Sequence, residues 1–369
     1  MIRRVTANNY LSLVDFEWVP RPETLVLGIN GSGKTSALRV IHRLAGFASG
    51  ELNPKQVMPF ERITAWSTEP YAALGLDLQS EDDLFRYEVE FTVDPEHGNT
   101  FVTSESLLHN GKPVFARVLN SVALVDSDGN YGQAFPLSRQ HSVVSAVEPR
   151  SENDPIRMFL QALDRVLVVR PIASTWKEES RESDEFLDPQ MGNVVSWYRL
   201  QAQNPEFQHA LNVFLRELWA GFSHLELRVV GQDAQILDIV FEASQVVGEE
   251  IRISFGGLSD GERTLIGLYM LSAYQQTHPG TTLIVDEPDN FVGLPELQPW
   301  LLRLLDERPE GGQVILVSHN DRIIDTMGYE SAALFTRADH LSPTRVRGIE
   351  PDRTGLALSE RLSRGWIGE

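Results

Sequence analysis

Residues 28–36, GINGSGKTS, combine glycine, lysine and hydroxyl side chains in a spacing that can hold phosphates. The glycines of a Gly-x-x-x-x-Gly-Lys-Thr pattern let successive backbone N–H groups point inward at an anion. Lys34 would reach the outer phosphates as a point charge, and the Thr35 hydroxyl would bind Mg²⁺. A helix-like run follows at 37–46, and its N-terminal end favours the same anion. The residues that we expect to contact a nucleotide are Asn30, Gly31, Ser32, Gly33, Lys34, Thr35 and Ser36.

Polar residues that can act on a phosphate also follow two other apolar runs. Asp286, after the run at 282–285, can complete the shell of a Mg²⁺ ion. Glu287 beside it can orient and polarise an attacking water. His319, after the run at 313–318, could contact a γ-phosphate, although a lone histidine is more often a surface residue. The phosphate loop in the same chain favours the catalytic interpretation over an acidic turn.

The stretch GGLSDGER at 256–263 precedes a helix-like run at 263–277. Ser259 and the N–H groups around Gly261 would face a phosphate at the start of that helix. Ser259 or Asp260 could equally cap the helix in a capping box, with Glu262 or Arg263 nearby. The residues alone leave both interpretations open.

Strands and helices that alternate along the chain would position these residues. Alternation and short apolar runs predict strands at 2–7, 11–19, 23–27, 71–78, 85–93, 225–230, 236–241, 282–286 and 313–318. Helical periodicity predicts helices at 33–46, 157–169, 194–203, 205–222, 263–277 and 297–307. HNGK at 109–112 is typical of a hairpin tip. Wholly apolar strands suit a sheet covered on both faces, so the order favours an α/β fold.

Composition limits the classes of function. The 369 residues include 32 basic and 52 acidic side chains, a net charge of −20, which disfavours nonspecific binding to DNA or anionic lipid. A local basic groove could still contact nucleic acid. The absence of cysteine excludes disulfides and thiolate metal sites. Without a long apolar run or a signal-peptide core, we expect a cytoplasmic protein that does not enter a membrane.

Taken in chain order, GINGSGKT, LSDGE, LIVDEP and VSH resemble the Walker A, signature, Walker B and switch-histidine motifs of ABC-type ATPases. The opening IRRVTANNYLSLVDFEW and the long interval between Thr35 and Leu258 resemble the SMC/RecF/OLD branch more than transporter ATPases. The block DEPDNFVGLPELQPWLLRLLD is similar to stand-alone bacterial AAA family ATPases akin to OLD proteins.

The resemblance implies a fold and a domain order. The fold class would be α/β, a P-loop NTPase similar to an ABC ATPase head, with a β-rich lobe and a helical insert. An N-terminal part of the ATPase core with the P-loop would span 1–60, and the β-rich lobe 61–150. The helical insert would span 151–225, and the C-terminal part of the core, with the other three motifs, 226–369.

The resemblance also implies an activity. Such proteins hydrolyse ATP with Mg²⁺, and two subunits bind head to tail around the nucleotide. Lys34, Glu287 and His319 would be catalytic, and Thr35 and Asp286 would hold the metal. Ser259 and Gly261 would contact the nucleotide of the partner in a homodimer. The family's Q-loop glutamine, also near the metal, would be Gln140, with Gln133 as the rival.

The resemblance suggests antiphage defence together with a separate effector. OLD nucleases carry a Toprim domain with an acidic metal site after the ATPase, and no second D-x-D cluster follows residue 321. We therefore expect a separate nuclease or toxin to act. The alternatives are a nucleotide-gated scaffold that holds a toxin-like partner with little turnover, and a DNA repair ATPase that clamps DNA directly.

Overall fold

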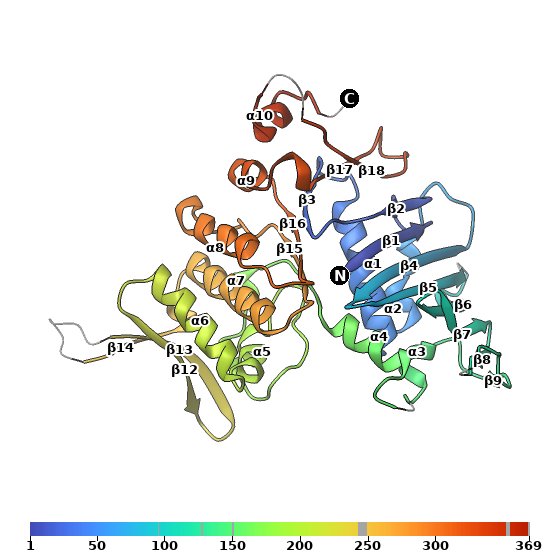
Figure 1. The fold of residues 1–369 in the computed structure, drawn as a ribbon, viewed down its shortest axis with the longest axis horizontal. Coiled ribbons are helices and arrows are strands. Elements are labelled where there is room, and N and C mark those ends of the chain that lie inside the picture. Colours follow the sequence, from blue (N-terminus) through green and yellow to red (C-terminus); the bar gives the residue numbers. More distant parts are fainter. Residues whose placement is uncertain (95, 127, 150, 243–248, 352–354, 368–369) are drawn as a thin grey trace. The chain divides into compact units, whose positions relative to one another are not determined.

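The computed structural model describes residues 1–94, 96–126, 128–149, 151–242, 249–351 and 355–367 (Figure 1). The chain forms two compact units. The first contains Met1–Val166 and Met327–Glu369, and the second contains Leu167–Thr326. None of the helices in these described ranges is long and apolar enough to cross a membrane.

An antiparallel sheet of eight strands dominates the first unit, in the order β2-β1-β4-β5-β6-β7-β8-β9. Alternation places one face of β5 in the core and leaves the other face open. Because β1 pairs with β4, strands from the expected N-terminal segment and the expected β-rich lobe share one sheet. The strands are β1 (Ile2–Asn8), β2 (Phe16–Trp18), β4 (Tyr71–Ser80), β5 (Asp83–Asp94), β6 (Asn99–His109), β7 (Lys112–Val118), β8 (Ser121–Leu124) and β9 (Phe135–Pro136).

The predicted hairpin tip at 109–112 is confirmed. Asn110 and Gly111 join β6 to β7 with φ angles of 50° and 77°. Two consecutive positive φ angles give the turn twist that matches paired strands, and Asn-Gly adopts them at low cost.

A second group of strands in the first unit carries the P-loop. β3 (Glu23–Leu27) runs parallel to β17 (Ala332–Thr336), which pairs antiparallel with β18 (Arg345–Gly348). The following helix α1 (Lys34–Ser49) contacts β1 and β4 through a buried apolar face, so the predicted helix is confirmed and extended. The short helices are α2 (Pro54–Val57), η1 (Phe60–Arg62), α3 (Val143–Ala146), α4 (Pro155–Asp164) and α10 (Leu358–Ser363).

The second unit combines an antiparallel sheet with a parallel strand pair. The sheet contains β11 (Glu179–Ser180), β12 (Phe222–Val230), β13 (Ala234–Phe241) and β14 (Ile251–Ser254), with η2 (Ala173–Thr175) and η3 (Phe255–Gly257) nearby in the chain. The parallel pair is β15 (Thr282–Asp286) and β16 (Gln313–Val317), and each of their residues is buried, as the apolar runs predict. β10 (Val166–Val169) lies beside β15.

Helix α7 (Asp260–Thr277) is the core of the second unit. It is buried on nearly all sides and contacts α5 (Val194–Gln201), α6 (Pro205–Leu218) and α8 (Leu294–Asp306). The Trp300 indole N–H of α8 donates to the Leu268 carbonyl at 3.0 Å and to the Ser272 hydroxyl at 2.9 Å. A polar bond therefore fixes α8 against α7 within an apolar contact. Helix α9 (Asp321–Ser331) begins in the second unit and is interrupted at Gly328.

Two helices and one strand are shorter in the structure than the sequence predicts. Residues 166–169, Val-Leu-Val-Val, form β10 instead of the last turn of α4, as β-branched residues favour. Helix α6 ends at Leu218, because Trp219 takes an extended conformation, and Gly221 with a φ of 79° then leads into β12. Within the predicted strand at 11–19, Leu11 and Asp15 have positive φ angles, so only β2 forms.

A fully buried ion pair joins β6 and β7 to the segment that follows the sheet. The Arg117 guanidinium lies 3.5 Å from the Glu105 carboxylate, and neither side chain is exposed. Burial raises the pKa of Glu105, against the hydrogen bonds that the carboxylate accepts. Its donors are Tyr87, Ser142 and Val143, while Arg117 donates to the carbonyls of Leu119, Leu137, Ser138 and His141.

We predict that Glu105→Ala lowers the free energy of unfolding by about 3–5 kcal/mol, because Arg117 keeps its buried charge without a carboxylate. Urea unfolding measures the loss. The control is Glu88→Ala on the open face of β5, where the side chain is 54% exposed. We expect it to change stability by less than about 0.5 kcal/mol. Equal losses in the two variants would contradict a structural role for the buried pair.

Candidate functional site

The loop between β3 and α1 has the backbone that phosphate binding requires. Gly28, Gly31 and Gly33 take φ angles of 143°, 81° and 101°, which side chains with a Cβ disfavour. Gly33 is the N-cap of α1, with no side-chain cap and no acidic residue in the first turn. The first N–H groups of a helix have no intrahelical partner, so this helix end can accept an anion. The predicted residues Asn30 and Gly31 are exposed at the tip, and Thr35 and Ser36 are half-buried.

Residues from the C-terminal part of the first unit support the loop. The Thr344 hydroxyl donates to the Ser32 carbonyl at 3.0 Å and shares a hydrogen bond with the Ser12 hydroxyl at 2.8 Å. A Cβ on Gly33 would lie 2.2 Å from Thr344 Oγ1. Arg337, just after β17, donates to the Gly31 carbonyl at 3.0 Å. No sequence motif indicates Arg337 or Thr344, because contacts between residues about 310 apart leave no local pattern.

Two side chains of the loop have an arrangement that suits a bound polyphosphate. Lys34 Nζ donates to the carbonyls of Gly28 at 2.5 Å and Ile29 at 3.1 Å, so its charge lies across the loop. The Ser32 hydroxyl is buried and has no hydrogen-bond partner among the described residues. Buried polar groups normally have partners, and a phosphate oxygen would supply one here.

In the second unit the chain turns sharply at the end of β15. Asp286 closes the strand and is buried. Glu287 takes a φ of 55°, and its N–H donates to the Val317 carbonyl at the end of β16 at 2.8 Å. A left-handed conformation is costly for a residue with a Cβ and often occurs at functional sites. The two strand ends therefore fix the backbone of Glu287.

Two donors bind the carboxylate of Glu287. Arg170, which directly follows β10, and Asn290, at 2.9 Å, both donate to Oε2. Burial alone would raise the pKa of Glu287, but these bonds and the charge of Arg170 hold it below the ordinary value. Glu287 is therefore ionised at neutral pH and can accept a hydrogen bond from water. His319 is exposed after β16, and the neighbouring Ser318 hydroxyl donates to Asp289 at 2.8 Å.

At the start of α7 the capping interpretation is confirmed. The Ser259 hydroxyl accepts from the Glu262 N–H, and the Glu262 carboxylate accepts from the Ser259 N–H, which completes a capping box. A Cβ on Gly261 would lie 2.6 Å from the Phe291 carbonyl, so glycine allows the loop after β15 to approach this helix. The Phe291 side chain is 62% exposed. A phosphate contact by Ser259 or Gly261 stays a prediction.

The glutamine expected near a metal lies beside the large sheet of the first unit. The Gln140 side chain donates to the Thr100 carbonyl at 3.2 Å. The rival Gln133 is exposed. The role of either residue stays a prediction.

The predicted site residues form two groups, one in each unit. The first unit holds the P-loop, and the second brings the ends of β15 and β16 together with the start of α7. Sequence reasoning missed Arg170, which directly follows the predicted helix at 157–169. Its signal was the same as that of Asp286 and His319, a polar residue directly after an apolar run.

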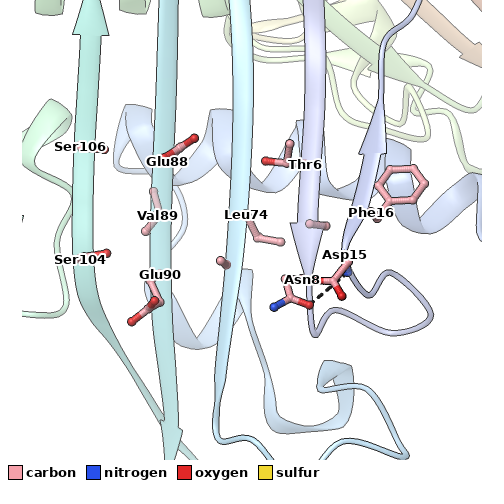
Figure 2. A pocket seen from close by; sticks show the side chains of 12 residues that line it. Thr6, Asn8, Asp15, Phe16, Leu74, Glu88, Val89, Glu90, Ser104 and Ser106 are labelled. Atoms are coloured by element: carbon pink, nitrogen blue, oxygen red, sulfur yellow. Dashed lines mark hydrogen bonds between the residues drawn. The ribbon is translucent and has the colours of Figure 1, made fainter. Parts of the chain in front are cut away.

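A hollow of about 360 Å³ on the open face of the large sheet is less suited to phosphates (Figure 2). Thr6 and Asn8 line it from β1, and Glu88 and Glu90 from β5. Asp15 adds a further carboxylate. The negative side chains would repel a nucleotide, which favours the P-loop as the site for the anion.

Comparisons with known proteins agree with the motifs. A family model described as "AAA domain, putative AbiEii toxin, Type IV TA system" matches residues 161–325. An OLD nuclease from Thermus scotoductus is 25% identical over 388 residues, an alignment that covers 96% of this chain. The chain spans 66% of that relative, just under two thirds of its length.

The fold is similar to solved SMC heads. A SmcHead bound to the C-winged helix domain of ScpA is 14% identical, with a TM-score of 0.56, covering 94% of this chain and 98% of that chain. A head domain from Thermotoga maritima is 15% identical, with a TM-score of 0.50 and coverages of 95% and 99%. An Smc head with an extended coiled coil, bound to the C-terminal domain of ScpA derived from Pyrococcus furiosus, is 14% identical, with a TM-score of 0.54 and coverages of 99% and 98%.

The protein has an SMC head-like ATPase fold of mixed α/β content, consistent with a P-loop NTPase. The matched domain, the OLD relative and this fold together support an ABC-type ATPase of the SMC and OLD kind. The predicted fold class and family resemblance are therefore confirmed.

We predict that Gly33→Ala lowers the free energy of unfolding by about 3 kcal/mol, because strain at a positive φ adds to a clash with Thr344. The matched control is Gly98→Ala, whose φ is 62° and whose Cβ would meet no atom within 4 Å. It should cost only about 1 kcal/mol. Thermal unfolding of both variants checks the difference, and equal losses would argue against the support of the loop by Thr344.

Proposed function

We propose that this protein binds and hydrolyses ATP, closes into a head-to-tail homodimer around MgATP, and thereby drives or gates a separate effector. The observation that carries this proposal is the ionised carboxylate of Glu287, held at the end of a buried strand in a chain that also has a P-loop. A structural turn has no need of a strained backbone and two donors on one carboxylate oxygen.

The P-loop would bind the phosphates. Its backbone N–H groups and the N-terminal end of α1 would surround the β-phosphate. Lys34 would move from the carbonyls of Gly28 and Ile29 to the more negative β- and γ-phosphates. Ser32 would find in the phosphate the hydrogen-bond partner that it lacks.

The residues fit a magnesium ion that is bound together with the nucleotide. Among the described residues, no three His, Asp or Glu side chains gather that could hold a metal by themselves. Mg²⁺ typically takes one or two protein oxygens and completes its shell with phosphates and water. The Thr35 hydroxyl and the Asp286 carboxylate would be those protein ligands, with Gln140 as a further candidate. The ion would neutralise charge on the phosphates as the bond breaks.

Glu287 would act on the water. Its carboxylate would accept a hydrogen bond from the attacking water and orient the oxygen toward the γ-phosphate. His319, exposed after β16, would contact the same phosphate. Hydrolysis removes the group that these residues contact, so the nucleotide's affinity for the closed state falls.

Dimerisation would use the surface at the start of α7. Ser259 and Gly261 would face the nucleotide of the partner subunit, where the N-terminal end of α7 favours a phosphate. The exposed Phe291, beside Gly261, would be covered in the dimer. With a net charge of −20, a protein effector such as a nuclease or toxin suits the closed dimer better than nonspecific DNA. With a nuclease or toxin as its effector, the ATPase would act in antiphage defence.

We predict that Lys34→Ala weakens ATP binding at least about tenfold, because the phosphates lose a charge-assisted hydrogen bond. Isothermal titration calorimetry measures the affinity. Lys55→Ala, at an exposed lysine of α2, is the control and should bind like the wild type. Unchanged affinity in Lys34→Ala would refute the role of the P-loop.

We predict that Glu287→Gln keeps MgATP binding, lowers turnover at least about 100-fold, and accumulates the dimer. An amide cannot accept the proton of water as a carboxylate does. Light scattering with and without MgATP measures the mass, and phosphate release measures turnover. Glu310→Gln, at an exposed position after α8, is the control.

Adding Ser259→Arg to Glu287→Gln should spare nucleotide binding and prevent the dimer. A dimer that still forms would exclude the start of α7 from the interface. Wild-type turnover in Glu287→Gln would remove Glu287 from the mechanism. Very slow turnover by the wild type itself would favour the nucleotide-gated scaffold.

A further inference from the structure

Arg170 is an unexpected partner of the proposed catalytic carboxylate. It donates to Oε2 of Glu287, and Asn290 donates to the same oxygen. Among the described residues, both bonds therefore go to one oxygen of the carboxylate. Neither donor binds the other oxygen, Oε1, and the Glu287 side chain is 32% exposed.

The backbone of Arg170 is fixed on both sides. Its N–H donates to the Pro189 carbonyl at 2.6 Å. Its own conformation is restricted by the next residue, Pro171, which is buried. An arginine on an anchored backbone can hold a carboxylate in one direction, because the planar guanidinium presents its donors in a fixed geometry.

The ion pair contributes little to stability. The side chains of Arg170 and Glu287 are 46% and 32% exposed, and pairs this accessible to water stabilise a fold by about 0–1 kcal/mol. Stability alone does not account for two donors on the carboxylate of a residue whose backbone is also strained. The need to orient the carboxylate accounts for these two donors, because a general base must lie within hydrogen-bond reach of its water in the correct direction.

We propose that Arg170 is a positioning residue for Glu287: it holds Oε2, together with Asn290, so that Oε1 meets the attacking water. The inference rests on the proposed ATPase function. Arg170 touches neither water nor nucleotide in this role and acts through Glu287. The arrangement follows the logic of catalytic groups in which a third residue orients the base.

The test measures kcat, KM and calorimetric ATP affinity for Arg170→Ala and Arg170→Lys. We expect kcat to fall about tenfold in Arg170→Ala with KM, affinity and melting temperature unchanged, since a misdirected base loses rate and not binding. Arg170→Lys should recover much of the rate, because an ammonium can still donate to Oε2. Arg181→Ala, at an exposed arginine of the same unit, is the matched control and should behave as the wild type.

A double variant separates this inference from the proposed function. If Arg170 acts only through Glu287, then Arg170→Ala should cause no further loss of rate in the Glu287→Gln background. Additive losses would overturn the inference, and so would wild-type or faster turnover in Arg170→Ala alone. A Glu287→Gln enzyme that turns over normally would refute the proposed function itself and the role of Arg170 with it.

Discussion

The close approach of Gly33 to Thr344 is the constraint on which the P-loop depends. The loop can direct its N–H groups inward only if its backbone takes positive φ angles, and Gly33 does so against a threonine that leaves no room for a Cβ. Thr344 in turn bonds to the Ser32 carbonyl and the Ser12 hydroxyl. The loop is therefore shaped before any ligand arrives, and binding need not order it.

The second unit uses a different device to place polar side chains. Its parallel strands are wholly buried, so polar residues occur where the strands end. Asp286 ends β15 and Glu287 follows it, His319 comes after β16, and Arg170 follows β10. The buried strands thus place two carboxylates, a histidine and an arginine at strand ends, and backbone hydrogen bonds hold Glu287 and Arg170.

Local patterns predicted the loop, the strand ends and the cap of α7, because glycine spacing, apolar runs and S-x-x-E carry their geometry with them. They did not predict Thr344 or Arg337, which reach the loop from the far end of the chain. Arg170 was missed because the whole run 157–169 was predicted as a helix. A short apolar run fits a helix or a strand equally well. β17, a short apolar strand at 332–336, was missed as well.

The buried pair of Glu105 and Arg117 limits how this protein can change during evolution. Loss of either charge leaves the other buried without compensation, whereas replacement of both by apolar residues of similar volume can be neutral. Arg117 also donates to backbone carbonyls, and these would lose their hydrogen-bond donor if Arg117 alone were replaced. Positions 105 and 117 should therefore covary among relatives, with both charges present or both absent.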